Sequence, residues 1–350
     1  MDDSSDTFWL LEKRFTQKPS LTDSDPVSRQ RRIHAMKADI ALPRSDAIQA
    51  SGLPVVDPTT LEGRAFDQLR QHLARVNPTR ALEIPTGLEH LHLIAVVSPQ
   101  GGTGRTTITA NLSAALQKAG HSVVALDLDP QNTLQHHFRE RYHPAAEPPG
   151  ISRPETNWRS CVQSTECGAM LLPFGSVDDT QRDALEAKLR KDASWLRENL
   201  DAMHFARDTV VVMDLPAGSS VYLRQALSVA TMAVIVSLAE ASSYIALSPF
   251  ELTIAHYTDD QPGFIGVGHV LNQLDEARSL NRDIAKVLQE SIGDALLAAV
   301  PYDPSIAESL AYHRNAYFHS PESVGCAALS ACAERLVERL LTSTLRAHTS

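Results

Sequence analysis

The sequence has little of what would place it in a membrane, outside the cell or on nucleic acid. No apolar run reaches about 18 residues, the length that a membrane-spanning helix needs. The chain opens MDDSSDTF, an acidic and polar start unlike that of a secretory signal peptide. Its 42 acidic residues outnumber 32 basic ones, and a net charge of −10 disfavours broad contact with nucleic-acid phosphates. We therefore expect a cytoplasmic protein with no transmembrane segment, for which a nucleic-acid partner is disfavoured.

Cysteine is also scarce. The four cysteines are Cys161, Cys167, Cys326 and Cys332, and five residues separate the members of each close pair. That spacing matches none of the short zinc-ligand spacings. Cys326 and Cys332 lie in a stretch rich in alanine and leucine, so we expect them to be buried as small apolar residues. The hydrophobic fraction of 43% and charged fraction of 21% are those of an ordinary soluble globular protein.

The first 90 residues differ in pattern from the rest. Only short helical patterns fit there, such as Phe8–Phe15 and Leu61–Val76, and Ser28–Lys37 is basic. We predict that 1–90 is a largely disordered or loosely docked arm with short helices. The prolines that break it are Pro19, Pro26, Pro43, Pro54, Pro58, Pro78 and Pro85.

From residue 91 onward, short apolar runs alternate with helical patterns. Near-continuous β-branched runs indicate strands that are buried on both faces, and the alternation predicts a mostly parallel sheet with helices on both faces, an α/β domain over 91–345. The runs are 91–97, 122–128, 169–174, 209–215, 232–238, 264–271 and 296–300. The helical patterns are 105–119, 179–201, 221–229, 277–291 and a covering helix over 325–345.

The most informative motif is a glycine-rich turn between the first strand and the first helix, PQGGTGRTT over Pro99–Thr107. Glycines let a backbone wrap tightly and direct its N–H groups at a phosphate, and the following helix N-terminus adds a favourable dipole. Arg105 would supply the cation that meets the terminal phosphate, and Thr106 the hydroxyl that ligates Mg²⁺. The turn therefore predicts a triphosphate site with magnesium.

Two further strands end in aspartate. Asp127 and Asp129 close the second strand in the segment DLDPQ, and Asp214 closes another in DLPAG. The carboxyl ends of parallel strands lie beside such a phosphate loop, so these carboxylates would hold the metal's water shell or orient an attacking water. Each aspartate alone is also compatible with a helix N-cap.

Together, these three motifs resemble the MinD/ParA class of P-loop ATPases, whose loop reads KGGxGKT and whose next strand ends in DxDPQ. The resemblance implies a deviant P-loop NTPase fold, ATP and Mg²⁺ as ligands, and a homodimer that forms on ATP binding. The loop residues that it implies for nucleotide binding are Gly101, Gly102, Thr103, Gly104, Arg105, Thr106 and Thr107.

The same resemblance assigns roles to residues outside the loop. Asp129 matches the residue that positions the attacking water, and Asp127 lies in the same switch; with Arg105 they form the implied catalytic set. Asp214, Asp127 and Thr106 are the implied metal residues. Asn272 matches an asparagine that contacts adenine, and Pro301 lies where the class wraps the base.

Within the class, several features are similar to the cellulose-biosynthesis (BcsQ) branch. These are an altered phosphate-loop lysine, the segment Leu171–Gly175 (LLPFG) and the segment Tyr302–Ser323. This resemblance implies an accessory or localisation factor for a membrane-embedded cellulose synthase that cyclic-di-GMP controls. It also implies recruitment to the inner membrane or a cell pole through protein partners. The arm is not part of the common core, so the resemblance implies nothing about it.

Two cationic positions depart from the class pattern. The lysine that would reach across the dimer to the partner's phosphates is Gln100, and the second lysine is Arg105. Arginine keeps the charge but is bulkier and grips phosphate differently, and glutamine brings no charge. A cation at a phosphoryl transition state is worth roughly 10³–10⁵ in rate. Our hypothesis is that nucleotide binding and dimerisation survive while hydrolysis is slow.

Three alternatives remain open at this point. A partition ATPase of the ParA type shares the motifs, but it needs a basic surface for DNA, which the acidic chain disfavours. A bacterial tyrosine-kinase module would explain a helix at Leu61–Val76, but such kinases end in a tyrosine-rich tail, and the last tyrosine here is Tyr317. A non-hydrolysing ATP-binding scaffold is compatible with Gln100 and Arg105.

Overall fold

A computed structural model describes residues 87–138, 149–153 and 156–347, with side chains as far as residue 342. All of these fall in one unit of the chain, Val76–Ser350. The helical patterns that we predicted at Phe8–Phe15 and Leu61–Val76 and the basic stretch Ser28–Lys37 lie outside the described residues. None of the helices in the described part is long and apolar enough to cross a membrane.

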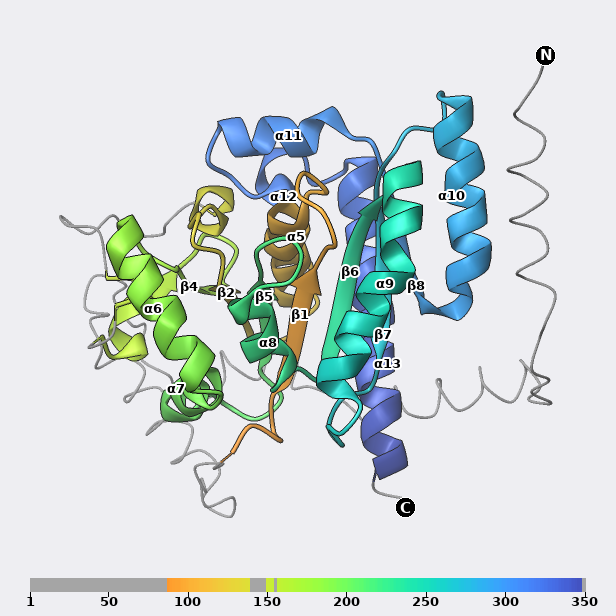
Figure 1. The fold of residues 1–350 in the computed structure, drawn as a ribbon. Coiled ribbons are helices and arrows are strands. Elements are labelled where there is room, and N and C mark those ends of the chain that lie inside the picture. The colour runs from red at the N-terminus through yellow and green to blue at the C-terminus, as the bar shows by residue number, and fades with distance from the viewer. Residues whose placement is uncertain (1–86, 139–148, 154–155, 348–350) are drawn as a thin grey trace. The chain divides into compact units, whose positions relative to one another are not determined.

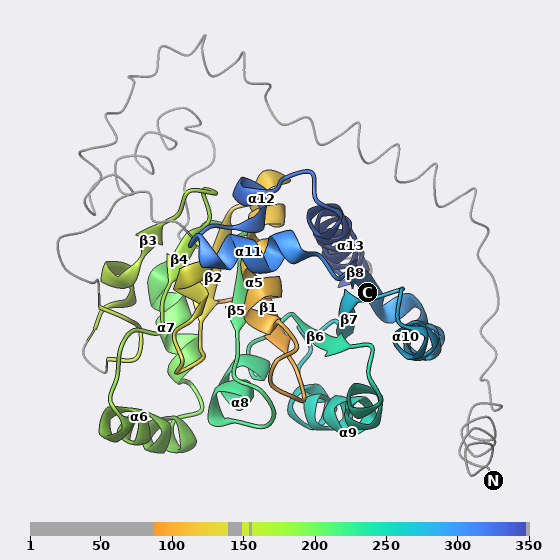
Figure 2. The same cartoon turned by 90° about the horizontal axis from the view of Figure 1, so that it is seen from above.

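The centre of the domain is an eight-stranded sheet with the strand order β3-β4-β2-β5-β1-β6-β7-β8 (Figures 1 and 2). Every neighbouring pair is parallel except β3 and β4. The predicted mostly parallel sheet is therefore confirmed. The strands are β1 (His92–Val97), β2 (Val123–Asp127), β3 (Gln163–Ser164), β4 (Met170–Leu172), β5 (Val210–Asp214), β6 (Met232–Leu238), β7 (Val267–Leu274) and β8 (Leu296–Pro301).

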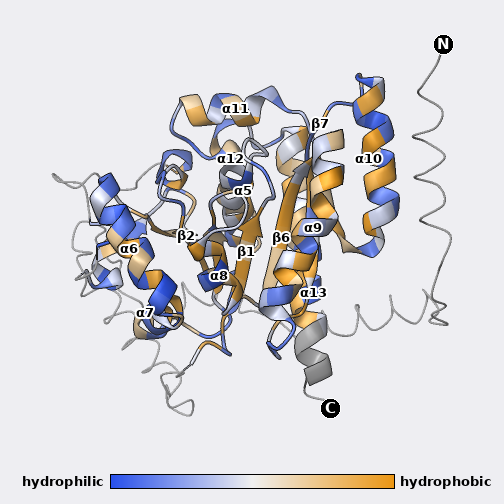
Figure 3. Cartoon of the chain, in the orientation of Figure 1, coloured by the Kyte–Doolittle hydropathy of each residue, from blue (hydrophilic) through white to orange (hydrophobic). Residues whose placement is uncertain are grey.

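Helices cover both faces of the sheet, which explains why its central strands are continuous apolar runs (Figures 2 and 3). On one face lie α5 (Arg105–Lys118) and α13 (Val324–Ala347), and on the other lie α8 (Val221–Leu227) and α9 (Ala241–Thr258). Successive residues of β1 point alternately to the two faces of the sheet. Leu93 packs in the core under α8 and α9, whereas Ile94 packs in the core under α5 and α13.

The last helix completes the second of these cores. Leu329, Leu336 and Leu340 of α13 are at most 2% exposed and share a cluster with Ile108 and Leu112 of α5. Cys326 and Cys332 are fully buried in the same cluster and carry free thiols, as we expected from their apolar surroundings. The closing helix predicted over 325–345 is thus confirmed, and α5 is covered by residues more than 200 positions later in the chain.

The single helix predicted over 179–201 is wrong, because two helices occupy this stretch. α6 (Asp179–Lys191) ends before Asp192, and α7 (Trp195–Met203) begins after Ser194. The Gln225 side chain fixes the break, since its Nε2 donates to the carbonyls of Leu189 and Asp192 while its Oε1 accepts the Leu196 N–H, 3.2 Å away. A buried amide in α8 thus satisfies backbone groups that a continuous helix would bond internally.

The helix α9 was absent from the sequence prediction. It has one charged residue, Glu251, and Pro249 lies inside it. Its polar and apolar residues do not separate onto opposite faces, since Ser243 is buried while Ile245 and Leu252 are exposed, so no amphipathic stripe is there for a periodicity argument to detect. The remaining described helices are η2 (Leu134–His137), η3 (Trp158–Cys161), α10 (Ser279–Ile292), η4 (Gly293–Ala295), α11 (Pro304–Ala311) and α12 (Ala316–His319).

Candidate nucleotide site

The glycine-rich turn lies between β1 and α5, at the edge of the sheet where the parallel strands end (Figure 1). Gly102 and Gly104 have φ angles of +77° and +84°, a left-handed conformation that residues other than glycine rarely adopt. Added Cβ atoms at Gly101 and Gly102 would meet nothing within 4 Å, so this backbone is open to a ligand. Gly104 is the N-cap of α5, and no side chain caps the helix. The N–H groups of its first turn are therefore available to an anion.

Two buried carboxyl groups lie directly beside this turn. Asp127 and Asp214 are paired residues on the neighbouring strands β2 and β5, and both are fully buried. The Asp127 carboxylate accepts the N–H groups of Asp129 (2.9 Å) and Leu134 (3.1 Å). Asp214 Oδ1 accepts the hydroxyl of Thr109 at 3.2 Å, whereas its Oδ2 has no hydrogen-bond partner among the described residues.

Burial dominates the protonation of this pair. It raises the pKa of Asp214 to about 7, although the nearby hydroxyls of Thr106 and Thr109 and the charge of Arg105 oppose the rise. Burial and the charge of Asp214 raise the pKa of Asp127 well above its usual range. Two adjacent buried carboxylates cannot both ionise at low cost without a positive charge between or beside them. The pair is therefore suited to a divalent cation.

Arg105 connects three of the loops at this edge. Its Nε donates to the carbonyl of Leu215 (2.8 Å), and its Nη1 donates to the carbonyl of Gln100 (3.1 Å). Its Nη2 lies 3.9 Å from Asp129 Oδ2. Burial lowers the pKa of the guanidinium, and the charges of Asp214 and Asp129 counter that effect. Arg105 therefore lies between the phosphate-binding turn and the aspartate predicted to orient water.

Two amide side chains hold the turn in place. Asn272, at the end of β7, is 6% exposed, and its Nδ2 donates to the carbonyl of Thr103 at 2.9 Å. Gln100 Nε2 donates to the carbonyl of Ser242 in α9 at 3.2 Å. The amide nitrogen of Asn272, which we expected to contact adenine, is thus bonded to the loop. No sequence signal revealed the Gln100 contact, because α9 itself was not predicted.

A cavity of about 400 Å³ opens beside Asn272, between the ends of β6, β7 and β8. Pro301 is the last residue of β8, but the residue that lines the cavity is its neighbour Tyr302. This volume lies within the range of roughly 300–1,000 Å³ found for small-molecule sites. The lining residues are Leu238, Glu240, Gln273, Asp275, Arg278, Asn281 and Tyr302.

The residues at this edge fit a magnesium nucleotide. Mg²⁺ prefers oxygen ligands, which Asp127, Asp214 and the Thr106 hydroxyl would supply. The orphaned Asp214 Oδ2 and the buried Thr103 hydroxyl, which also has no partner among the described residues, are polar groups that a bound ligand would satisfy. All the predicted site residues from Gly101 to Thr107, together with Asp127, Asp129, Asp214 and Asn272, lie at this one edge.

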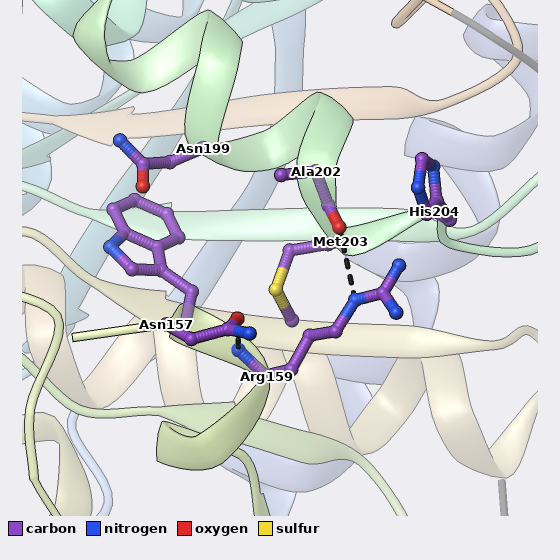
Figure 4. A pocket seen from close by; sticks show the side chains of 7 residues that line it. Asn157, Arg159, Asn199, Ala202, Met203 and His204 are labelled. Atoms are coloured by element: carbon purple, nitrogen blue, oxygen red, sulfur yellow. Dashed lines mark hydrogen bonds between the residues drawn. The ribbon is translucent and has the colours of Figure 1, made fainter.

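A second cavity, of about 380 Å³, lies elsewhere, between η3 and the end of α7 (Figure 4). There Arg159 Nε donates to the carbonyl of Ala202 at 3.0 Å, and the Met203 side chain points between the two elements. None of the residues predicted for the nucleotide site lines this cavity. The residues predicted from the motifs therefore lie at the phosphate-binding turn and not at this second cavity.

Comparison with known proteins identifies the family. The model of the family described as cellulose biosynthesis protein BcsQ matches residues 91–337. The chain belongs to the BcsQ family. The match covers the strands and helices that carry the phosphate-binding turn, the three aspartates and the end of β8, and it begins at the residue where we placed the start of the α/β domain.

Three of the proteins similar to this BcsQ-family chain share about a quarter of their aligned residues with it. The cellulose biosynthesis protein BcsQ of Salmonella typhimurium is 24% identical over 221 residues, which is 63% of this chain and 83% of that protein. The fold is similar to that of the cell division ATPase MinD of Pyrococcus furiosus, with a TM-score of 0.57, 26% identity and coverage of 71% of this chain and 98% of that chain. MinD of Pyrococcus horikoshii complexed with Mg-ADP matches with a TM-score of 0.57 and 24% identity, over 70% of this chain and 96% of that one. The class and the fold that the motifs predicted are thus confirmed.

Proposed function

We propose that this BcsQ-family protein is a magnesium-dependent ATPase that dimerises on ATP binding and serves bacterial cellulose synthesis and secretion as an accessory or localisation factor. The observation that carries the proposal is the meeting of the phosphate-binding turn, Arg105 and three aspartates at one edge of the sheet, in a chain of this family. The protein would act in the cytoplasm, and partners of a membrane-embedded cellulose synthase would recruit it to the inner membrane or pole.

The chemistry of the site supports a magnesium nucleotide. The open backbone at Gly101 and Gly102 would bind phosphate oxygens, while Thr106, Asp127 and Asp214 would hold Mg²⁺. Bound magnesium would neutralise charge on the transferring phosphoryl group. Asp129, which is 9% exposed and whose Oδ1 accepts the N–H of Gln131, is fixed at the mouth of the site, where it would orient a water.

Slow hydrolysis follows from the two altered cationic positions. Gln100 has no charge, and its amide is bonded to Ser242 of its own chain. Arg105 would therefore be the single cation of the turn itself that faces the phosphates. It already bonds to two carbonyls and lies near Asp129, so a nucleotide has to compete for it. Both features reduce the stabilisation of the transition state relative to a site with two lysines.

The first experiment measures hydrolysis by the purified full chain. We expect ATP turnover below about one per second, the low end of typical enzyme rates, and a further loss with Asp129→Asn while ATP binding is retained. Asp192→Asn, in the break between α6 and α7, is a matched control that should leave turnover unchanged. Turnover well above that rate, abolished by Asp129→Asn, would refute slow hydrolysis.

A second experiment tests the biological part of the proposal. In the organism that encodes the chain, deletion of the gene should lower cellulose output, and the wild-type gene but not one carrying Gly104→Ala should restore it. Light scattering of the purified chain with a non-hydrolysable ATP analogue should show a dimer that ADP does not support. Unchanged cellulose in the deletion strain would exclude the cellulose role, and DNA binding that requires ATP would favour partitioning instead.

A further inference from the structure

The segment that follows β2 is a tightly bonded turn, and it carries Asp129. The Asp127 carboxylate accepts the N–H groups of Asp129 (2.9 Å) and Leu134 (3.1 Å) and so holds the two ends of the turn. The Asn132 N–H donates to the carbonyl of Asp129 (2.9 Å). The Gln131 N–H donates to Asp129 Oδ1 (3.0 Å). The direction of the Asp129 carboxylate therefore depends on the backbone of Gln131 and Asn132.

The Asn132 side chain ties the middle of this turn to a segment 43 residues later in the chain. Its Oδ1 accepts the N–H of Gly175 at 3.0 Å. The φ angle of Asn132 is +52°, a left-handed conformation that asparagine adopts more readily than most residues with a side chain. Asparagine therefore meets both demands at this position, because it tolerates the backbone conformation and supplies an acceptor oxygen.

Gly175 is a rigid anchor for this bond. Its φ is +89°, and a Cβ added to it would lie 2.5 Å from the Cα of Gly150. Two backbone hydrogen bonds of 3.0 Å join residues 151–152 to residues 173–174, directly before Gly175. The Phe174 side chain is fully buried in the core. The Gly175 N–H is therefore held in place by two packed segments of backbone.

Hydrolysis places a stricter demand on this turn than nucleotide binding does. Misplacing a catalytic group by about 1 Å can cost roughly 100-fold in rate. The phosphate-binding turn is held separately, by the bonds from Asn272 and Arg105. We propose that Asn132 is a positioning residue for ATP hydrolysis, which acts by fixing the direction of the Asp129 carboxylate through its bond to Gly175. This inference rests on the proposed function, in which Asp129 orients the attacking water.

Two substitutions in the full chain separate the hydrogen bond from the backbone conformation. Asn132→Gly keeps the left-handed conformation but removes the acceptor, so kcat for ATP should fall at least about 10-fold. Asn132→Asp retains an acceptor oxygen and tolerates the same conformation, so it should recover at least about a third of the wild-type kcat. Both variants should bind a non-hydrolysable ATP analogue with Mg²⁺ within about threefold of the wild-type affinity, because the bond acts on the chemical step.

A double-mutant cycle tests whether Asn132 acts through Asp129. Asp129→Asn removes the group that orients the water, so adding Asn132→Gly to it should lower kcat by less than about threefold. Single-turnover hydrolysis of γ-labelled ATP measures these slow rates, and thermal melts check that each variant is folded. Asn157→Gly is a matched control. It removes an asparagine oxygen that accepts the Arg159 N–H at 3.0 Å, beside the second cavity, and should keep the wild-type kcat.

Three results in hydrolysis overturn the role of Asn132 and leave the proposed function intact. They are a wild-type kcat in Asn132→Gly, a kcat in Asn132→Asp no higher than in Asn132→Gly, and an equal loss from Asn132→Gly in the wild-type and Asp129→Asn backgrounds. An affinity for the ATP analogue that falls as much as kcat also overturns it, because the bond would then support the whole site. If the wild type does not hydrolyse ATP, or if Asp129→Asn hydrolyses it at the wild-type rate, the proposed role of Asp129 and this inference fail together.

Discussion

The side-chain amide of Asn272 donates a hydrogen bond to the carbonyl of Thr103, and so ties the end of β7 to the phosphate-binding turn. Because this bond holds the turn, Asn272→Ala should weaken binding of inorganic tripolyphosphate as well as of ATP, about 10-fold. Calorimetry measures both affinities. Asn199→Ala, which removes a similar amide-to-carbonyl bond within α7, should leave both unchanged. A loss confined to ATP would mean that Asn272 contacts the base.

Two glycines of the turn should respond differently to the same substitution. A Cβ at Gly104 would lie 2.4 Å from Asn272 Nδ2, and its φ of +84° is strained for alanine, so Gly104→Ala should lower nucleotide affinity at least about 10-fold. Gly101→Ala meets no atom within 4 Å in the free protein and should leave the thermal midpoint unchanged. Thermal melts and nucleotide titrations of both variants check this. Equal effects on the thermal midpoint would show that the contact with Asn272 does not constrain the turn.

Restoring a cation at position 100 should speed hydrolysis. Gln100→Lys breaks the bond to Ser242 and supplies a charge that can reach the phosphates, so we expect ATP turnover to rise at least about 10-fold. Gln100→Ala breaks the same bond without adding charge and should turn over ATP at the wild-type rate. A phosphate-release assay distinguishes these outcomes. If both variants are equally accelerated, release of α9 and not the added charge limits the rate.

The raised pKa of Asp214 predicts how stability depends on pH in the absence of metal. Its folded pKa of about 7 exceeds the unfolded value, so the folded state binds the proton more tightly and the free energy of unfolding falls as pH rises from about 4 to 7. Asp214→Asn resembles the protonated acid and should be more stable than wild type at pH 8, by on the order of 2–4 kcal/mol at about 1.36 kcal/mol per pKa unit.

Denaturant melts at pH 5 and pH 8 without Mg²⁺ measure this difference. Asp260 is exposed, and Asp260→Asn removes one negative charge outside the site. This variant should have the same free energy of unfolding as the wild type at pH 5 and at pH 8. Adding Mg²⁺ at pH 8 should stabilise the wild type but not Asp214→Asn. A variant that is less stable than wild type at pH 8 would contradict the cause that we assign to the raised pKa.

Much of the fold was predictable from local pattern. A run such as TVVVMDL has no polar alternation and is too short for a buried helix, so β5 was evident from its residues alone. The break between α6 and α7 was not, because it depends on Gln225, some thirty residues later, satisfying backbone groups at the break. Strand β3 was also missed, since two residues antiparallel to β4 leave no periodicity to detect.

The candidate site also contains features that the sequence predicts and features that it does not. The glycines and aspartates were predictable because their residue types and their places at strand ends are local features. The bonds from Arg105 to Leu215 and from Asn272 to Thr103 join segments more than 100 residues apart, and no spacing in a single sequence encodes them. The cavity beside Asn272 had no local signal either, because residues from near the ends of β6, β7 and β8 line it together.

The position of α13 late in the sequence limits when the domain can fold during its synthesis. The flank of α5 and the neighbouring strand β8 stay without their apolar cover until Leu329, Leu336 and Leu340 have been synthesised. A ribosome-bound chain therefore lacks the contacts of Ile108 and Leu112 with α13 until that helix has emerged. The helix that starts with the phosphate-binding turn cannot reach its final packing before α13 has been synthesised, so the proposed nucleotide binding requires a polypeptide that extends at least through Leu340.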